Sequence, residues 1–210
     1  VESKDGRFPK MVILNPSRRL QEKGVQILDV NVGLPEIDEV EMIKNAVFEL
    51  QSVIDLPLQI DTVDIEAMEQ SMRLYNGKPL VNSVNGKKKN MKDVFPLIKK
   101  YGGTLIALTI DEDGIPETVE GRIKIAEKII KTAKEYGIDK KDIVVDPLAM
   151  TISSDTNSAN ITLETVKRLS NMGIKTSLGV SNISFGLPNR EFVTSTFFAM
   201  ALQNGLNCAI

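Results

Sequence analysis

Acidic and amide side chains follow or interrupt short apolar runs at six places along the chain. These hydrogen-bond acceptors are Asp29 with Asn31, Asp61, Asn82 with Ser83, Asp111-Glu112-Asp113, Asp146, and Ser181 with Asn182. A single residue of this kind often caps the next helix. Capping is a poor explanation for six together, because an Asp or Asn inside an apolar run needs polar partners once it is buried. The pattern therefore indicates a bound polar ligand.

The residue types narrow the chemistry of that ligand. An aspartate carboxylate pairs through both oxygens with two adjacent N–H groups, as it does with an arginine side chain. A 2-amino-4-oxopyrimidine ring presents such a pair, so the aspartates favour a pterin or a guanine-like heterocycle. A divalent cation bound by several aspartates is the alternative. Asn82 and Asn182 suit either ligand, and the spacing alone does not decide between them.

Two residue counts limit the chemistry further. The chain has no His and a single Cys, Cys208. Ser-His-Asp catalysis, Cys-His catalysis and His-ligated metal sites are therefore excluded. A disulfide framework and a Cys-rich metal site are excluded as well. With the aspartates assigned to a heterocycle, we expect no catalytic metal.

Composition also bears on location and partners. The chain has 210 residues, 42% of them hydrophobic, and a net charge of −2, which suits one large globular domain. Its one basic run, Lys87-Lys88-Lys89, gives no basis for nucleic-acid binding. No apolar run approaches the ~20 residues of a membrane span, and no signal peptide is recognisable. With the lone cysteine, these features favour a cytoplasmic protein without a membrane partner.

Eight short apolar runs rich in β-branched residues predict strands, and helical patterns lie between them. The predicted strands are Met11–Leu14, Ile27–Val32, Leu58–Ile60, Leu80–Val84, Thr104–Ile110, Ile143–Val145, Lys175–Val180 and Leu206–Ile210. The clearest helical patterns are Val40–Ile54, Val119–Ala133, Ile161–Met172 and Glu191–Asn204. Gly137, Gly173 and Gly205 follow helix ends, as left-handed C-caps do.

The alternation of strands and helices predicts an α/β fold with a parallel sheet. Eight strands predict closure into a (β/α)8 barrel, the TIM barrel, although a doubly wound sheet fits the same pattern. In a barrel, the polar residues at the strand ends converge at the C-terminal mouth, where such enzymes hold their substrates.

Five segments hold most of these polar residues in recognisable surroundings. They read Ile27-Leu28-Asp29-Val30-Asn31-Val32-Gly33, Gln59-Ile60-Asp61-Thr62, Leu80-Val81-Asn82-Ser83, Val145-Asp146-Pro147 and Gly179-Val180-Ser181-Asn182-Ile183-Ser184-Phe185-Gly186-Leu187-Pro188. From about Ile27 to its last residue, the chain resembles the pterin-binding family, and the last segment is the most specific. The similar branch is the methyltetrahydrofolate methyltransferases. That branch includes the folate-binding domain of cobalamin-dependent methionine synthase and the methyltransferase that serves the corrinoid iron–sulfur protein.

The resemblance implies a TIM barrel that forms a single domain over residues 1–210, within a longer polypeptide, and it implies roles for the matched residues. Asp61, Asn82 and Asp146 would bind the pyrimidine edge and ring nitrogens of the pterin. Asn182 would hydrogen-bond N5, the nitrogen that bears the methyl group, and would be catalytic.

The resemblance also gives supporting residues. Asp29 and Asn31 stand where the family has supporting polar residues, with Asp29 in the catalytic set and Asn31 in the substrate-binding set. Ser83 joins the substrate-binding set as the neighbour of Asn82. Arg190 would contact the ligand or brace its loop.

The activity that the resemblance implies is transfer of the N5-methyl of 5-methyltetrahydrofolate to a Co(I) corrinoid, in methionine synthesis or one-carbon metabolism. A partner domain or protein would supply the corrinoid, and a homodimer is compatible with this resemblance. N5 must gain a proton or hydrogen-bond support as its bond to the methyl breaks. Without His, this support must come from Asn, Asp or water. Asn182 would orient N5 and stabilise the protonated amine through its carbonyl oxygen, a contact that strengthens in the transition state.

The first strand–helix unit departs from the family pattern. Met11-Val12-Ile13-Leu14-Asn15-Pro16 keeps only the Asn-Pro of the family's first-strand motif, and the helix that follows, Ser17–Lys23, is short. The chain also stops at the eighth strand, so the closing C-terminal helix is absent. A divergent first unit, a truncation and missing residues each explain this pattern. We favour missing residues, because seven of the eight units look intact.

Two other functions fit a pterin pocket. Dihydropteroate synthase uses the same barrel but needs cations for its pyrophosphate leaving group, and the stretch Val32–Ile37 contains no Arg. A folate-binding module without independent catalysis is the second alternative. Homocysteine activation by zinc on thiolates would require another domain or subunit.

Overall fold

The structure, a computed structural model, describes residues 17–33 and 38–210, so the predicted strand Met11–Leu14 lies outside the described residues. Its strands are β1 Leu28–Val30, β2 Leu58–Asp61, β3 Leu80–Asn85, β4 Thr104–Leu108, β5 Ile143–Asp146, β6 Lys175–Leu178 and β7 Cys208–Ala209. Its helices are α2 Glu39–Gln51, α3 Ile65–Leu74, α4 Lys88–Tyr101, α5 Val119–Glu135, α6 Ser158–Asn171 and α7 Arg190–Gln203, with 3₁₀ turns η1 Lys140–Asp142 and η2 Val180–Ser184. A short helix also covers residues 17–22.

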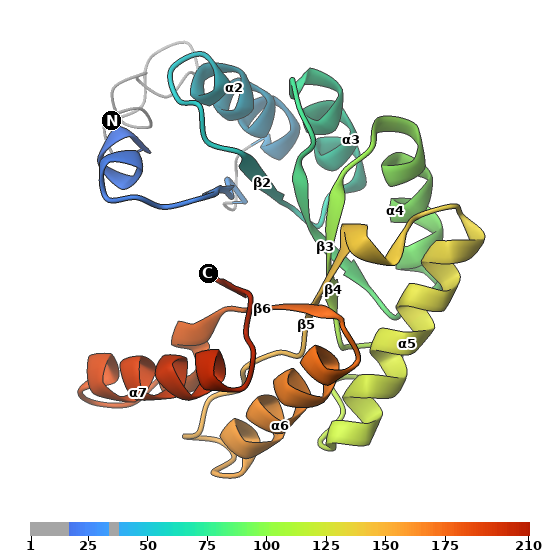
Figure 1. Cartoon of the computed structure of the whole chain (residues 1–210). Coiled ribbons are helices and arrows are strands. Elements are labelled where there is room, and N and C mark those ends of the chain that lie inside the picture. Colours follow the sequence, from blue (N-terminus) through green and yellow to red (C-terminus); the bar gives the residue numbers. More distant parts are fainter. Residues whose placement is uncertain (1–16, 34–37) are drawn as a thin grey trace. The chain divides into compact units, whose positions relative to one another are not determined.

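The strands follow one another in the sheet in chain order, from β1 to β7. A helix separates each strand from the next along the chain (Figure 1). A doubly wound sheet reverses its strand order at a switch point, so that alternative is wrong. The repeated strand–helix unit confirms the barrel type of fold, with seven of its strands among the described residues.

The chain divides into two compact units. The first consists of the residues up to Ser83 together with the later segment Leu97–Thr104. Within it, β1 pairs with β2 and β2 with β3, both in parallel. Helices α2 and α3 pack side by side (Figure 1). The buried residues of α2 are Ile43, Ala46, Val47 and Leu50. They lie on the helix face that the apolar spacing predicts.

The second unit comprises Val84–Pro96 and Leu105–Ile210. Its strands β4 to β7 pair in parallel, and α6 packs against both β6 and α7. One core cluster consists of Ala149, Leu163, Val166, Leu178, Ile183, Phe197, Ala201 and Leu206. Helix α5 buries Ile123, Ala126 and Ala133 as predicted, but it also buries Arg122.

Local sequence sets where the helices begin and end. The side chains of Asp38, Asp64 and Thr118 cap α2, α3 and α5 by accepting a hydrogen bond from a first-turn N–H. The predicted C-cap glycines after α5, α6 and α7 all have φ between 67° and 96°. The N-caps of α2, α3 and α5 are therefore not the polar residues at the strand ends, so capping of these three helices does not explain those residues.

Gly86 lies where β3 leaves the sheet, and its N–H donates to the Ile110 carbonyl at 2.7 Å. A methyl group there would lie 2.8 Å from Ile125 Cγ2 and 3.1 Å from the Ile110 carbonyl oxygen. We expect Gly86→Ala to lower the free energy of unfolding by ~1–3 kcal/mol, because a backbone atom cannot yield as a side chain can. Urea denaturation measures the loss. Gly33→Ala is the control, since its methyl would meet nothing closer than 3.7 Å; equal midpoints for the two variants would contradict the prediction.

Candidate functional site

In the first unit, four polar side chains form a row on β1, β2 and the residue that follows β1. Asp29 is paired in register with Gln59, and Gln59 Nε2 donates to Asp29 Oδ1 at 2.6 Å. Two positions further along, Asn31 Nδ2 donates to Asp61 Oδ2 at 3.0 Å. Side chains two residues apart on a strand share a face, so the four residues line one face of this strand pair. The sequence predicts three of them and misses Gln59.

Gln59 is the buried member of this row, with 3% of its surface exposed. Its spacing of two from Asp61 is the signal that could have identified it. Desolvation raises the pKa of Asp29, the Gln59 amide lowers it, and the negative charge of Asp61 raises it. Asp29 is exposed by surface area. The sum of these three effects still raises its pKa, so Asp29 holds a proton more readily than an ordinary aspartate does.

Asn82 extends the same face onto β3. It is paired in register with Asp61, and its carbonyl accepts the Thr62 N–H at 3.0 Å. Its side chain is half-buried and has no hydrogen-bond partner among the described residues. Ser83, joined to Asn82 by a cis peptide bond, is also half-buried. The structure thus brings Asp29, Asn31, Asp61 and Asn82 onto one face of the first unit, as the sequence predicts for strand ends. Among the described residues, the Ser83 side chain makes no hydrogen bond to these four.

In the second unit, Asp146 ends β5 with 7% of its surface exposed. Its Oδ1 accepts the N–H of Leu148 at 2.7 Å, and Oδ2 has no donor among the described residues. Burial raises the pKa of Asp146 to about 6, against the lowering effects of the Leu148 N–H and the positive charge of Arg122. A buried carboxylate with an open oxygen can accept a pair of donors from a ligand.

Asn182 lies in η2, the 3₁₀ turn Val180–Ser184, and is exposed. The sequence predicts a strand up to Val180, but β6 ends at Leu178 because the backbone turns there: the Asn182 N–H donates to the Gly179 carbonyl at 3.2 Å. The side-chain amide of Asn182 has no hydrogen-bond partner among the described residues. It lies over Gly179, so that a methyl group on Gly179 would be 2.9 Å from Nδ2.

This close approach gives a prediction for Gly179→Ala. The added methyl would push the Asn182 amide aside, and a misplacement of about 1 Å commonly costs ~10–100-fold in rate. For the methyl transfer that the sequence resemblance implies, we expect the rate to fall by that factor with little change in folate affinity. If the effect acts through Asn182, the double variant with Asn182→Ala should be no slower than Asn182→Ala alone. Losses that multiply in single-turnover kinetics would contradict the prediction.

Arg190, the first residue of α7, braces the loop in which Asn182 lies. Its Nε donates to Ser184 Oγ at 3.1 Å and its Nη2 to the Ser181 carbonyl at 3.0 Å. The guanidinium also lies over the Phe185 ring, 5.8 Å from the ring centre. Of the two roles expected for Arg190, bracing is the one this geometry supports.

The acidic run Asp111-Glu112-Asp113 belongs to a turn closed by a bridge between Asp111 and Gly114. Glu112 accepts the Lys88 N–H at 2.6 Å and pairs with Lys128 at 3.2 Å. These contacts account for the run as part of the local structure. Among residues 17–33 and 38–210, no group of three acidic or Cys side chains is arranged to hold a metal ion, and no helix in the described part is long and apolar enough to cross a membrane.

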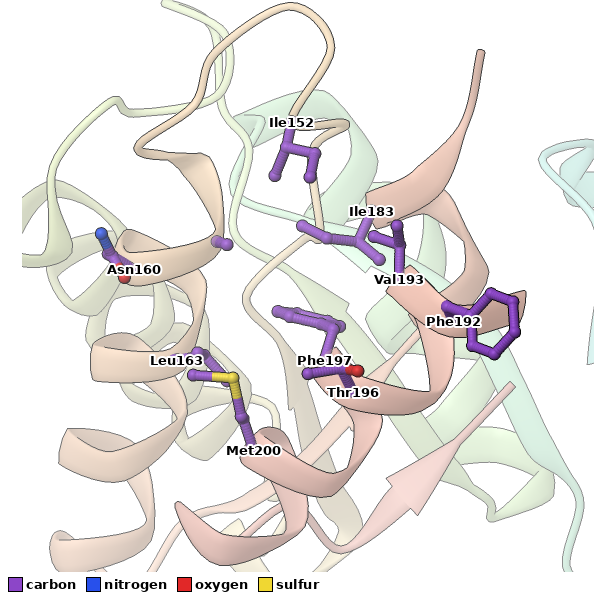
Figure 2. Close-up of a pocket in the computed structure, with 10 residues that line it drawn as sticks. Ile152, Asn160, Leu163, Ile183, Phe192, Val193, Thr196, Phe197 and Met200 are labelled. Carbon is purple, nitrogen blue, oxygen red and sulfur yellow. The ribbon is translucent and has the colours of Figure 1, made fainter. Parts of the chain in front are cut away.

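A cavity of about 420 Å³ lies between α6 and α7, and none of the predicted ligand groups is among the residues that line it. Its wall comes from both helices, with Ile152 and Ile183 at one end (Figure 2). Asn160 and Thr196 are its polar residues and the remainder are apolar. A pterin needs several acceptors and donors, so this cavity does not suit the ligand that the strand ends predict.

Comparison with known proteins defines first the fold and then the family. Dihydropteroate synthase from Vibrio fischeri ES114 superposes with a TM-score of 0.78 at 15% identity, over 96% of this chain and 82% of that one, which shows the pterin-binding TIM-barrel fold. The family model for pterin binding enzymes matches residues 3–210. The chain belongs to the pterin-binding enzyme family.

Two curated relatives show which branch the sequence is similar to. Methylcorrinoid:tetrahydrofolate methyltransferase of Eubacterium limosum is 31% identical over 216 residues, covering 100% of this chain and 78% of that protein. Methionine synthase of Mycobacterium leprae (strain TN) is 30% identical over 201 residues, covering 89% of this chain and 17% of that protein. The chain thus spans under a fifth of the length of that methionine synthase. Both relatives support the methyltransferase branch.

Proposed function

We propose that this chain binds 5-methyltetrahydrofolate and catalyses transfer of its N5-methyl to a Co(I) corrinoid held by a partner domain or protein. The observation that carries the proposal is the similarity, over the whole chain, to a methylcorrinoid:tetrahydrofolate methyltransferase. That relative's name gives the opposite direction of transfer. One transition state serves both directions, so residues that stabilise it accelerate both.

Each unit contains polar groups of the kind that a pterin requires. We assign Asp61 and Asn82, which share a face of the first unit, to the ring nitrogens and the pyrimidine edge. We assign Asp146 to the same ring, where its carboxylate would accept the N–H pair that the amino group and ring nitrogen offer. Asn31 would hold Asp61 in place through the 3.0 Å hydrogen bond between them, and Ser83 would support Asn82.

N5 needs a group whose interaction strengthens as the methyl leaves. We assign Asn182 to this role because its amide is exposed and has no protein partner among the described residues. Its carbonyl oxygen would accept a hydrogen bond from the protonated N5. Asp29, whose pKa is raised by partial desolvation, is the group we assign to hold a proton near the ring. Arg190 would keep the turn around Asn182 in place.

The corrinoid, when its partner domain docks, supplies the cobalt nucleophile. This chain's residues bind the folate, orient N5 and support its protonation. The chain contains no His and therefore offers no imidazole ligand for cobalt or zinc. This agrees with a corrinoid that is held by a partner.

Two assays on the purified chain test the proposal. Calorimetry with 5-methyltetrahydrofolate measures binding without a corrinoid. Single-turnover kinetics with Co(I) cobalamin, followed by the cobalt absorbance, measures methyl transfer. Folate binding without transfer would favour a folate-binding module, and synthesis of dihydropteroate from a pterin pyrophosphate and p-aminobenzoate would favour the synthase. No folate binding would refute the proposed function.

A further inference from the structure

Arg122 is buried in the second unit without an ion-pair partner. It lies on α5 with 2% of its surface exposed. No carboxylate in the described part of the chain makes a salt bridge with it. An arginine is rarely buried this deeply unless it is paired, because removal of its charge from water is costly. Stability alone therefore does not account for this residue.

The guanidinium of Arg122 instead donates to three carbonyl groups and a hydroxyl. Its Nη1 lies 2.8 Å from the Pro147 carbonyl oxygen, 2.8 Å from that of Leu148 and 3.0 Å from Thr162 Oγ1. Its Nε donates to the Pro116 carbonyl at 3.0 Å. Two of the three carbonyls belong to the residues that directly follow Asp146.

The backbone at Leu148 has an unfavourable conformation, which hydrogen bonds to its carbonyl group help to stabilise. Leu148 has a φ of 64°, a left-handed conformation that costs a residue with a side chain of this size ~1–3 kcal/mol. This conformation points the Leu148 N–H at Asp146 Oδ1, 2.7 Å away. Arg122 holds the carbonyls on the other side of the same turn.

We infer that Arg122 is a positioning residue: it holds the Pro147-Leu148 turn so that the Leu148 N–H fixes the Asp146 carboxylate for the pterin. The inference rests on the proposed function. Arg122 itself would not contact the ligand. It acts through the turn and through its charge on Asp146.

The charges around Asp146 give the inference a measurable signature. The shift in its pKa has three causes: burial raises it, while the Leu148 N–H and the charge of Arg122 lower it. Arg122 in turn interacts with the charges of Asp146 and Asp155, against a burial that lowers its own pKa. Loss of the Arg122 charge should therefore raise the pKa of Asp146 further and move the pH midpoint of folate binding upward.

Three variants separate the charge from the geometry. Arg122→Met removes the charge and keeps the apolar stem, Arg122→Lys keeps a charge without the planar fork, and Thr162→Val removes one partner of Nη1. Arg168→Met is the matched control: Arg168 pairs with Glu120 at 2.6 Å between α6 and α5, at the surface, and does not contact the turn. The probe is 5-methyltetrahydrofolate, with its Kd measured by calorimetry from pH 5 to 8.

We expect Arg122→Met to raise the Kd roughly tenfold at pH 7, the effect of about one misplaced hydrogen bond, with a higher pH midpoint. Arg122→Lys should weaken binding but keep the wild-type midpoint more closely, Thr162→Val should weaken binding by a smaller factor, and the control should match the wild type. Combined with Asp146→Asn, Arg122→Met should add no further loss of affinity.

A wild-type Kd and midpoint in folded Arg122→Lys and Thr162→Val would overturn the inference even if Arg122→Met does not fold. A lowered melting temperature with unchanged binding would also overturn it, because that is the result of a purely structural role. Losses that multiply with those of Asp146→Asn would show that Arg122 acts elsewhere. Failure of the wild-type chain to bind folate would instead refute the proposed function and this inference with it.

Discussion

Replacement of Asn182 by alanine is expected to lower the rate of methyl transfer by ~10²–10³, with at most a small change in the Kd for 5-methyltetrahydrofolate. In the ground state N5 is a weakly basic amine, so a hydrogen bond to it contributes little to binding. In the proposed reaction N5 takes up a proton as the methyl leaves, and its contact with the Asn182 carbonyl oxygen would then gain strength. Interactions made mainly in the transition state appear in the rate.

Single-turnover transfer to Co(I) cobalamin, beside equilibrium binding of folate, measures the two quantities separately. Asn171→Ala is the matched control, because Asn171 is an exposed amide at the C-terminal end of α6. Equal losses of rate and affinity would make Asn182 a binding residue only. No loss in either would mean that the assignment of this turn to N5 is wrong and that Asn182 serves the turn itself, where asparagine is common.

The second large effect is expected for Asp146→Asn, in which folate affinity and stability should change in opposite directions. Asparagine keeps an oxygen for the Leu148 N–H but could not form the proposed charge-assisted pair with the pterin. The affinity should fall by about 1.5–3 kcal/mol at pH 8. Wild-type binding should weaken as the pH falls through about 6, the pKa of Asp146, whereas binding by the variant should lack this step.

The stability change follows from the same pKa. In the unfolded chain Asp146 ionises near its ordinary value of 3.8, and in the folded protein near 6. Between these values the unfolded state releases its proton first, so wild-type stability falls as the pH rises from about 4 to 6. A shift of about two units corresponds to up to about 3 kcal/mol. Asp146→Asn has no proton to release there, and should therefore melt at a higher temperature than the wild type at pH 7 and without this pH step.

Thermal melts from pH 4 to 8, run beside calorimetric titration, test both parts. Asp113→Asn is a suitable control, because Asp113 is an exposed carboxylate in a turn. If Asp146→Asn binds folate as tightly as the wild type, Asp146 is not a ligand group. If Asp146→Asn is instead less stable than the wild type at neutral pH, the Asp146 carboxylate stabilises the fold. Its raised pKa would then not lower the stability of the wild type.

The order of strands and helices follows from the sequence alone, because it depends on local periodicity. Apolar residues at 3.6-residue spacing predict the buried face of α2, and the left-handed glycines predict the ends of α5, α6 and α7. Short apolar runs predict β1 to β7 to within a few residues. Six polar interruptions of those runs predict a ligand site at the strand ends, before any long-range contact is known.

The tertiary structure decided which of these residues meet. The pairs Asp29 with Gln59 and Asn31 with Asp61 each join residues 30 positions apart, and such pairs depend on the register between strands. The burial of Arg122 against the turn after Asp146 spans 25 positions and leaves no periodic signal, since an arginine on a helix is usually exposed. Local spacing constrains neighbours along the chain, whereas burial and long-range hydrogen bonds are set only when separate elements pack together.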